Sequence, residues 1–261
     1  MVGINVLFDA VKRHEAVEKL VVREGVQGQE RRYYRFRPAR WYGGIVTADC
    51  VGCGLLCKFC WVSDKALYHP AATGTFYSIE SVVENMKRIA KQFDLKQLRL
   101  SGGEPTLGKD HLLGLLELLK TEGYTFILET NGIPIAYDDD YTFQLSKYNF
   151  VHVRVSLKGC NESEFAMLTG AKPENFKLQL NALKKLVEYD VSCHPSVMAS
   201  FSKSDSLQKL VKRLTEIDEK LAEDLEIEEL ILYPHVKEKI KKHALQYYVG
   251  HSPNKVPPEQ I

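Results

Sequence analysis

Four of the chain's six cysteines lie within eleven residues, from Cys50 to Cys60. The last three of them, Cys53, Cys57 and Cys60, have the spacing C-x3-C-x2-C. Three thiolates on one short loop can hold three corners of a cubane iron–sulfur cluster and leave its fourth iron without a protein ligand. An open metal position favours chemistry over a purely structural role, so this loop predicts a catalytic cluster.

The other cysteines leave two alternatives open. Cys50 as a fourth ligand would close the cluster and make the protein an electron carrier, and four thiolates also suit a tetrahedral zinc ion. We expect Cys50 instead to be a spare, solvent-facing thiol, because it precedes the three-cysteine pattern. Cys160 and Cys193 are most simply small buried residues. Four cysteines in one short loop are not typical of a disulfide framework. In a reducing compartment this clustering favours metal binding.

Composition gives no global argument for a nucleic-acid or membrane partner. In 261 residues, 35 Lys and Arg balance 34 Asp and Glu, for a net charge of +1. No apolar run approaches the ~20 residues that a membrane-spanning helix needs. The first residues lack the basic and then apolar plan of a signal peptide, so we expect a cytoplasmic protein.

Hydrophobic periodicity predicts strands and helices that alternate along the chain. A helix over 6–23 and a strand over 31–41 come first. Six further strands are predicted over 45–48, 97–100, 124–128, 150–155, 191–197 and 228–232. The helices between them include one capped by Ser78, others over 111–119 and 207–221, and segments through 165 and 186. This alternation predicts a parallel sheet, either doubly wound or closed into a full or partial barrel.

Polar residues cluster at the ends of these predicted strands. They are the cysteine loop, Gly102-Gly103-Glu104, Glu129-Thr130-Asn131, Ser156-Leu157-Lys158, His194 and His235. Because the carboxyl ends of parallel strands share one rim, where ligands bind, we expect these residues to form one site.

The cysteine pattern, with Phe59 before its last cysteine, and Gly102-Gly103-Glu104 one helix later resemble the radical S-adenosylmethionine (SAM) superfamily over residues 44–235. The resemblance implies an α/β fold with a partial (β/α)6 TIM-type barrel over 44–236. Residues 1–43 would form an N-terminal helix and strand extension, and 237–261 a C-terminal helix and Pro-rich tail. It also implies a [4Fe-4S] cluster on the three cysteines, with SAM bound at the open iron.

The same resemblance implies a set of SAM contacts. Gly102 and Gly103 lack Cβ atoms and let the backbone approach the methionyl group, while Glu104 can accept hydrogen bonds from its ammonium. The simpler alternative makes 101–105 merely a turn. The whole expected set is Phe59, Gly102, Gly103, Glu104, Thr130, Asn131, Ser156, Lys158, His194 and His235.

The second half is most similar to activating enzymes of glycyl radical enzymes, such as the pyruvate formate-lyase activating enzyme. Residues 155–170 resemble the fourth strand of those enzymes and the helix that follows it. Tyr233-Pro234-His235 resembles a motif whose histidine approaches SAM. Ser156 and Glu129 stand where those enzymes carry aspartates, and the Gly-Pro-Gly before their cysteine loop is absent. The resemblance therefore implies fold, cofactors and a low-potential donor such as ferredoxin or flavodoxin, whereas protein, RNA, peptide and small-molecule substrates all stay open.

The segment 31–42 is the one concentration of basic and aromatic residues. Such interleaving suits phosphate contact and base stacking, so it could bind a structured RNA. The alternative is an edge strand guarded by charge. Its acidic partners would then be residues such as Glu223, Asp224, Glu226, Glu228 or Glu229. We expect the lysine-rich helix over 237–242 to present a solvated face.

Overall fold

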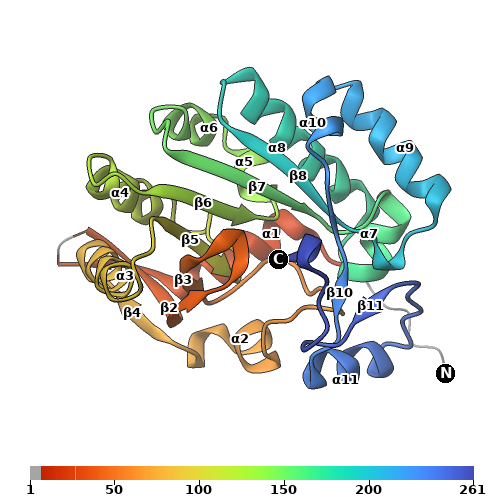
Figure 1. Ribbon diagram of the computed structural model, residues 1–261, viewed down its shortest axis with the longest axis horizontal. Helices are drawn as coiled ribbons and strands as arrows, with labels where there is room; N and C mark the ends of the chain where they lie inside the picture. The colour runs from red at the N-terminus through yellow and green to blue at the C-terminus, as the bar shows by residue number, and fades with distance from the viewer. Residues whose placement is uncertain (1–6, 27) are drawn as a thin grey trace.

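A curved, mostly parallel sheet with helices on its outer side forms the body of the protein (Figure 1). The computed structural model describes residues 7–26 and 28–261. The strands are β1 (Val22–Gly25), β2 (Gly28–Ala39), β3 (Ile45–Cys50), β4 (Thr75–Tyr77), β5 (Gln97–Gly102), β6 (Thr125–Thr130), β7 (Val151–Leu157), β8 (Cys193–Met198), β9 (Glu226–Glu228), β10 (Leu230–Ile231) and β11 (Gly250–His251). The order β3-β5-β6-β7-β8-β9 is parallel throughout, which confirms the predicted partial barrel.

Several helices begin at a capping side chain. The α-helices are α1 (Ala10–Val21), α2 (Asp64–Tyr68), α3 (Ile79–Phe93), α4 (Lys109–Leu119), α5 (Ile133–Tyr137), α6 (Asp139–Leu145), α7 (Glu162–Thr169), α8 (Phe176–Glu188), α9 (Ser204–Thr215), α10 (Glu219–Glu223) and α11 (Pro234–Lys242). The Asp9 side chain accepts from the first turn of α1, Ser78 caps α3 as predicted, and Asn161 caps α7. Each of these side chains satisfies a backbone N–H that has no partner inside the helix.

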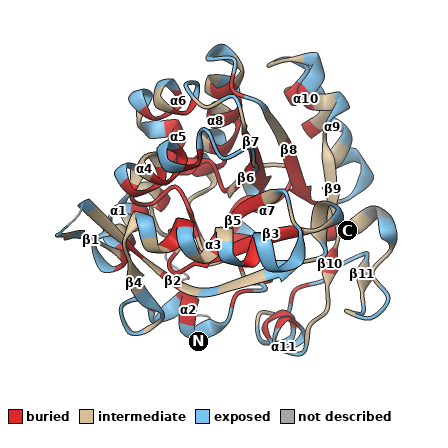
Figure 2. Ribbon diagram, turned by 60° about the vertical axis from the view of Figure 1, so that its left-hand side comes forward, coloured by how far each residue is buried: buried red, intermediate tan, exposed pale blue. Residues whose placement is uncertain are grey.

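Side chains alternate between the two faces of each central strand. In β5, Leu98 and Leu100 are buried in the hydrophobic core, while Arg99 and Ser101 bond to polar groups of neighbouring strands. In β7, Val153 and Val155 repeat the core-facing half of this pattern. Figure 2 shows the buried residues concentrated along these central strands. The apolar face of the sheet therefore packs under the helices, and the inner face of the barrel is polar.

The N-terminal segment belongs to the same sheet as the barrel. The first helix is shorter than the predicted 6–23, and residue 6 lies outside the described residues. The predicted strand over 31–41 is β2, which pairs with β1, β3 and β4 and so is not an edge strand. Neither β1 nor β4 was predicted. The sheet therefore continues across the expected domain boundary at residue 43.

Two predicted elements near the C-terminus are each divided in two. The helix expected over 207–221 is α9 followed by α10, because Asp218 caps a new helix by accepting from Lys220 N. The strand expected over 228–232 is β9, in the barrel sheet, and β10, which pairs with β11 of the tail. The tail therefore carries regular pairing that its Pro-rich composition did not predict. Across the residues that the structure describes, no helix combines the length and apolar character needed to span a membrane.

Arg31 connects β2 to the loop after β5. Its side chain is buried at 1% exposure, and its Nε and Nη2 donate to the carbonyl oxygens of Leu107 and Glu104 at 3.0 and 3.1 Å. Within the described residues, no carboxylate forms an ion pair with it. The guanidinium is therefore held by main-chain carbonyls, which it fixes in turn.

Replacement of this residue by Arg31→Met should destabilise the fold. The change removes the side-chain hydrogen bonds to the buried carbonyls of Leu107 and Glu104, and Glu104 O keeps only the longer bond from Leu107 N at 3.3 Å. The free energy of unfolding should therefore fall by about 2–4 kcal/mol. Urea denaturation of the metal-free protein measures the change. The matched control Arg40→Met alters an exposed residue of the same segment and should change stability by less than about 0.5 kcal/mol. Equal stability of the two variants would contradict the role of Arg31.

Candidate active site at the mouth of the barrel

A cavity of about 710 Å³ lies on the inner side of the curved sheet. The cysteine loop and the carboxyl ends of the barrel strands line it, together with the N-terminal end of α11. The predicted site residues that line it are Cys53, Cys57, Phe59, Cys60, Gly102, Gly103, Thr130, Asn131, Ser156, Lys158 and His235. Glu104 and His194 are the two predicted residues that do not. The fold therefore brings most of the expected site together at one rim.

The three cysteines of the pattern face this cavity from one loop. The Cys53 Sγ accepts from Leu55 N at 3.4 Å and from Asn131 Nδ2 at 3.6 Å. Burial raises the pKa of all three thiols, that of Cys57 to about 12, so they are protonated at neutral pH without a metal. Among residues 7–26 and 28–261, no three His, Cys, Asp or Glu side chains are grouped as ligands of a single metal ion.

The loop after β5 lies directly against the cysteine loop. Gly103 N donates to Cys50 O at 2.8 Å, and Glu104 N donates to Gly52 O at 2.7 Å. A Cβ atom on Gly103 would lie 2.2 Å from Gly52 O, and Gly102 has a φ of +94°. Both glycines are therefore required by close approach and by backbone conformation, which is more than an ordinary turn demands.

The Glu104 side chain differs from its expected role. Its carboxylate is 1% exposed and accepts from the hydroxyls of Thr106 and Thr130, each at 2.6 Å, and from Asn131 N at 2.8 Å. These donors come from the loop itself and from the end of β6. The carboxylate therefore joins the two strand ends inside the protein and does not face the cavity as an acceptor for an ammonium group.

His194 also lies away from the site. It is the second residue of β8, because the strand begins at Cys193 and not at the expected residue 191. Its Nδ1 hydrogen-bonds His152 Nε2 at 2.6 Å, and its Nε2 bonds Glu226 Oε2 at 3.0 Å. It is therefore a partly buried histidine bonded to two neighbouring side chains, and it does not line the cavity. By contrast, His235 lines the cavity and bonds Trp61 O at 2.6 Å.

Cys50 is not the solvent-facing thiol that the sequence predicted. It ends β3 at 0% exposure beside Tyr33, and burial raises its pKa to about 12. It does not line the cavity. Cys160 is buried as expected, whereas Cys193 is only partly buried.

Lys239 holds the cysteine loop from the C-terminal helix, a role that the sequence did not reveal. Its Nζ donates to the carbonyl oxygens of Cys60 and Val62 at 2.9 and 2.5 Å and pairs with Asp64 at 3.0 Å. Only 5% of the residue is exposed, unlike its neighbours Lys237, Lys241 and Lys242. The expected solvated face of α11 is therefore interrupted at one position, four residues after His235 on the same side of the helix.

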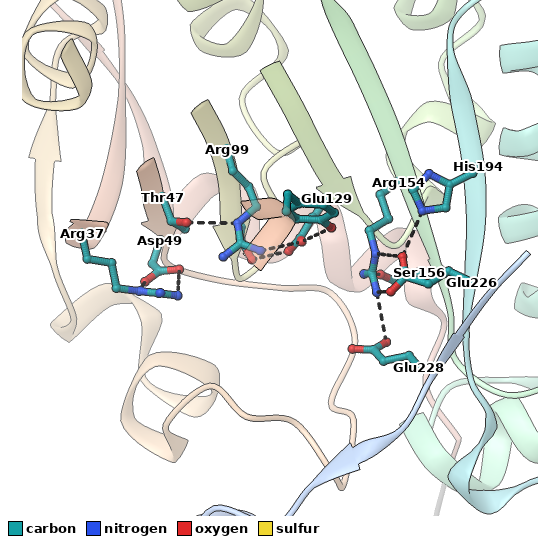
Figure 3. Close-up of polar contacts among 12 residues, drawn as sticks. Arg37, Thr47, Asp49, Arg99, Glu129, Arg154, Ser156, His194, Glu226 and Glu228 are labelled. Carbon is teal, nitrogen blue, oxygen red and sulfur yellow. Dashed lines mark hydrogen bonds and ion pairs between the residues drawn. The ribbon is translucent and has the colours of Figure 1, made fainter. Parts of the chain in front are cut away.

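A row of ion pairs lies along the inner face of the barrel (Figure 3). It comprises Arg37–Asp49 at 2.9 Å, Arg99–Glu129 at 2.9 Å and Arg154–Glu226 at 2.6 Å. Burial raises the pKa of Glu129, but Arg99, Arg154 and the donors Ser101 and Tyr42 together lower it to about 2. Strand alternation is the sequence signal that could have found these residues.

The basic and aromatic segment 31–42 does not form one external surface. Arg31 is buried, while Arg35 and Arg37 turn toward the barrel and line the cavity with Trp41. Their acidic partner is Asp49, and not the residues near the C-terminus that we expected. The structure therefore removes the continuous patch on which an external RNA surface would depend.

Comparison with known proteins identifies the class to which this fold and site belong. The family model of the Radical SAM superfamily matches residues 49–214, which is more than half of the chain. The protein therefore belongs to the radical SAM superfamily. This membership confirms the resemblance seen in the sequence and supports an enzyme with SAM-dependent radical chemistry.

Individual relatives agree with this assignment. A glycyl-radical enzyme activating enzyme-like protein of Methanocaldococcus jannaschii is 26% identical over 180 residues, which cover 66% of this chain and 64% of that protein. Streptococcus suis SuiB bound to S-adenosylmethionine has a TM-score of 0.56 at 15% identity over 80% of this chain and 52% of its own. The anSMEcpe structure with bound AdoMet and Cp18Cys peptide has a TM-score of 0.53 at 22% identity over 73% of this chain and 50% of its own. The chain thus spans less than two thirds of each relative, and the structural likeness shows the fold.

The variant Lys239→Met should loosen the cysteine loop. It removes two hydrogen bonds to loop carbonyls, so amide protection over residues 57–64 should fall by at least about tenfold. Hydrogen–deuterium exchange of the metal-free protein measures this change. Lys242→Met, on the same helix but exposed, is the matched control and should leave the exchange of the loop as it is. Unchanged protection in Lys239→Met would show that the loop is held by other contacts.

Proposed function

We propose that this protein is a radical SAM enzyme with one [4Fe-4S] cluster bound by Cys53, Cys57 and Cys60. The observation that carries the proposal is that these three thiols and the backbone of Gly102 and Gly103 line one cavity. Three thiol donors leave one iron of such a cluster without a protein ligand. Cys50, the only other cysteine of the loop, is buried outside the cavity, which argues against a fully ligated electron carrier.

The residues around the thiols suit SAM as the second cofactor. When bound, the reduced cluster supplies the electron that splits SAM into methionine and a 5′-deoxyadenosyl radical, which abstracts hydrogen from the substrate. The two glycines let the loop after β5 pack against the cysteine loop, so that its main chain lines the cavity beside the thiols. Thr130, Asn131, Ser156, Lys158 and His235 offer hydrogen-bonding groups around it, and Phe59 offers an apolar ring. Lys158 adds a positive charge that stabilises thiolate at Cys57.

For the electron donor and the substrate we propose only a chemical class. A low-potential ferredoxin or flavodoxin is required as a class, because the sulfonium of SAM is hard to reduce. The activating-enzyme relative and the peptide bound to anSMEcpe support an activase-like reaction on a protein. Modification of a small metabolite is the alternative, supported by the cavity of about 710 Å³. We place the protein in the cytoplasm and treat residues 1–43 and 237–261 as additions to the barrel of 44–236.

Anaerobic reconstitution with iron and sulfide, followed by an assay for 5′-deoxyadenosine, tests the proposal. We expect one cluster per chain and SAM cleavage after reduction by dithionite. A protein that binds iron but neither binds nor cleaves SAM would be a non-catalytic iron–sulfur protein. Zinc bound in preference to the cluster would also overturn the proposal.

Single cysteine variants separate the cluster ligands from the spare thiol. Cys57→Ala should lose the visible absorbance of the cluster and reduce 5′-deoxyadenosine to background, because one corner of the cluster loses its ligand. Cys50→Ala should retain both signals, because this thiol lies outside the cavity. Iron content, absorbance and product analysis measure the two variants side by side. Loss of cleavage in Cys50→Ala, with the fold intact by circular dichroism, would revive the four-ligand alternative.

A further inference from the structure

One side of the cavity carries a surplus of positive charge. Arg35 and Arg37 on β2 pair with Asp49 and Thr47 on β3, and cross-strand partners share a face of the sheet. Thr47 accepts from Arg99 inside the barrel, so this is the inner face. Both arginine Nε atoms donate to Asp49 Oδ2, at 2.7 and 2.9 Å. Two guanidinium groups therefore share one fully buried carboxylate.

The donors left over on this side are available to a ligand. Among the described residues, the terminal nitrogens of Arg35 form no hydrogen bond, and Arg37 adds only a 3.5 Å contact to Asp49 Oδ1. The two side chains are 45% and 24% exposed, and both line the cavity. Tyr34 and Trp41 lie beside them on the same wall. This wall can accept an anionic group attached to a flat or apolar body.

The opposite side of the cavity carries a surplus of negative charge. Glu226 and Glu228 of β9 both line it, and Arg154 is the cation nearest to them. Arg154 binds Glu226 with two hydrogen bonds, at 2.8 and 2.6 Å. Its Nη2 lies 3.8 Å from Glu228 Oε2, which is too far for a hydrogen bond, and no described residue donates one to Glu228. Two carboxylates therefore share one guanidinium.

The curvature of the sheet makes these two surpluses face a common space. β2 and β9 stand far apart in the strand order, yet residues of both line the same cavity. Figure 3 shows Arg37 at one end of the row and Glu228 at the other, with the Arg99–Glu129 pair between them. That central pair is internally neutral. The cavity is therefore charge-separated, positive at β2 and negative at β9.

We propose that the substrate of this site is a zwitterion of amino-acid type, with an anionic group bound at Arg35 and Arg37 and an ammonium group bound at Glu228. This rests on the proposed function, since it describes the molecule acted on beside SAM. The two carboxylates at β9 would repel a polyanion such as RNA. The two guanidiniums at β2 would repel a purely cationic ligand. A zwitterion is attracted by both sides. The SAM contacts proposed above include none of these three residues, so the two ligands use different parts of the cavity.

Fragment probes that carry one or both charges test the charge requirement. The probes are ω-amino acids from 4-aminobutanoate to 8-aminooctanoate, with alkanoates and alkylamines of equal length, and O-phosphoethanolamine to separate carboxylate from phosphate. Isothermal titration calorimetry measures their affinity for the anaerobic holoprotein with SAM and for the metal-free protein. We expect at least one zwitterion to bind about tenfold more tightly than either singly charged probe of its length.

Charge-removing variants assign each end of the ligand. The double variant Arg35→Gln with Arg37→Gln should weaken the zwitterion and the alkanoate by about tenfold and leave the alkylamine unchanged. Glu228→Gln should weaken the zwitterion and the alkylamine instead. The matched controls are Arg40→Gln and Glu223→Gln, at exposed positions that do not line the cavity. Circular dichroism and thermal denaturation confirm that each variant is folded.

Three outcomes would overturn the proposal. These are equal affinity for zwitterions and alkanoates, no binding of any probe up to its solubility limit, and affinities that the cavity variants change no more than the controls do. Failure of the proposed function is a separate result, because it appears as absence of 5′-deoxyadenosine in the unaltered protein. Charge-selective binding in the metal-free protein would then still show that the cavity accepts a zwitterion.

Discussion

The site depends on backbone contact between two loops that follow neighbouring parallel strands. The loop after β5 donates two main-chain hydrogen bonds to the cysteine loop, and a single methyl group on Gly103 would collide with Gly52 O. The parallel pairing of β3 with β5 brings the two loops to the same rim. Buried Glu104 and Arg31 then fix the second loop from the far side. The thiols and the glycines are thus positioned together by hydrogen bonds that involve no cofactor.

Sequence patterns predicted the parts of this arrangement that depend on local spacing. The cysteine pattern, the glycine pair and the alternation of strands with helices were enough for the barrel and for the rim at which its loops meet. These sequence signals predict the location of the site because parallel strands place their carboxyl ends at one rim, and this does not depend on how individual side chains pack. The position of His235 at the cavity followed from the same rule, since it comes shortly after β9, the last strand of the barrel sheet.

The missed features are those set by tertiary contact. Lys239 has the same sequence surroundings as its exposed lysine neighbours, and only the packing of α11 on the cysteine loop distinguishes it. Glu104 was assigned to a ligand, but four donors from the protein already bond to its carboxylate. His194 was assigned to the rim of the barrel, but it is the second residue of β8 and lies near the amino end of that strand. In each case the residue type indicated a polar role, but the sequence did not indicate which way the side chain points.

The charged inner face of the barrel is better explained by ligand binding than by stability. Replacing a buried ion pair with apolar residues of similar volume is often neutral or stabilising, so a barrel filled for stability alone would use branched aliphatic side chains. Here Arg99 and Arg154 are retained with their carboxylate partners on strands that are apolar on the opposite face. The ion pairs also differ in net charge. At the β2 end of the row there is one arginine more than the carboxylates, and at the β9 end there is one glutamate more than the arginines. An excess of charge at both ends of an otherwise neutral row matches the ligand that we propose, which carries the two opposite charges at its ends.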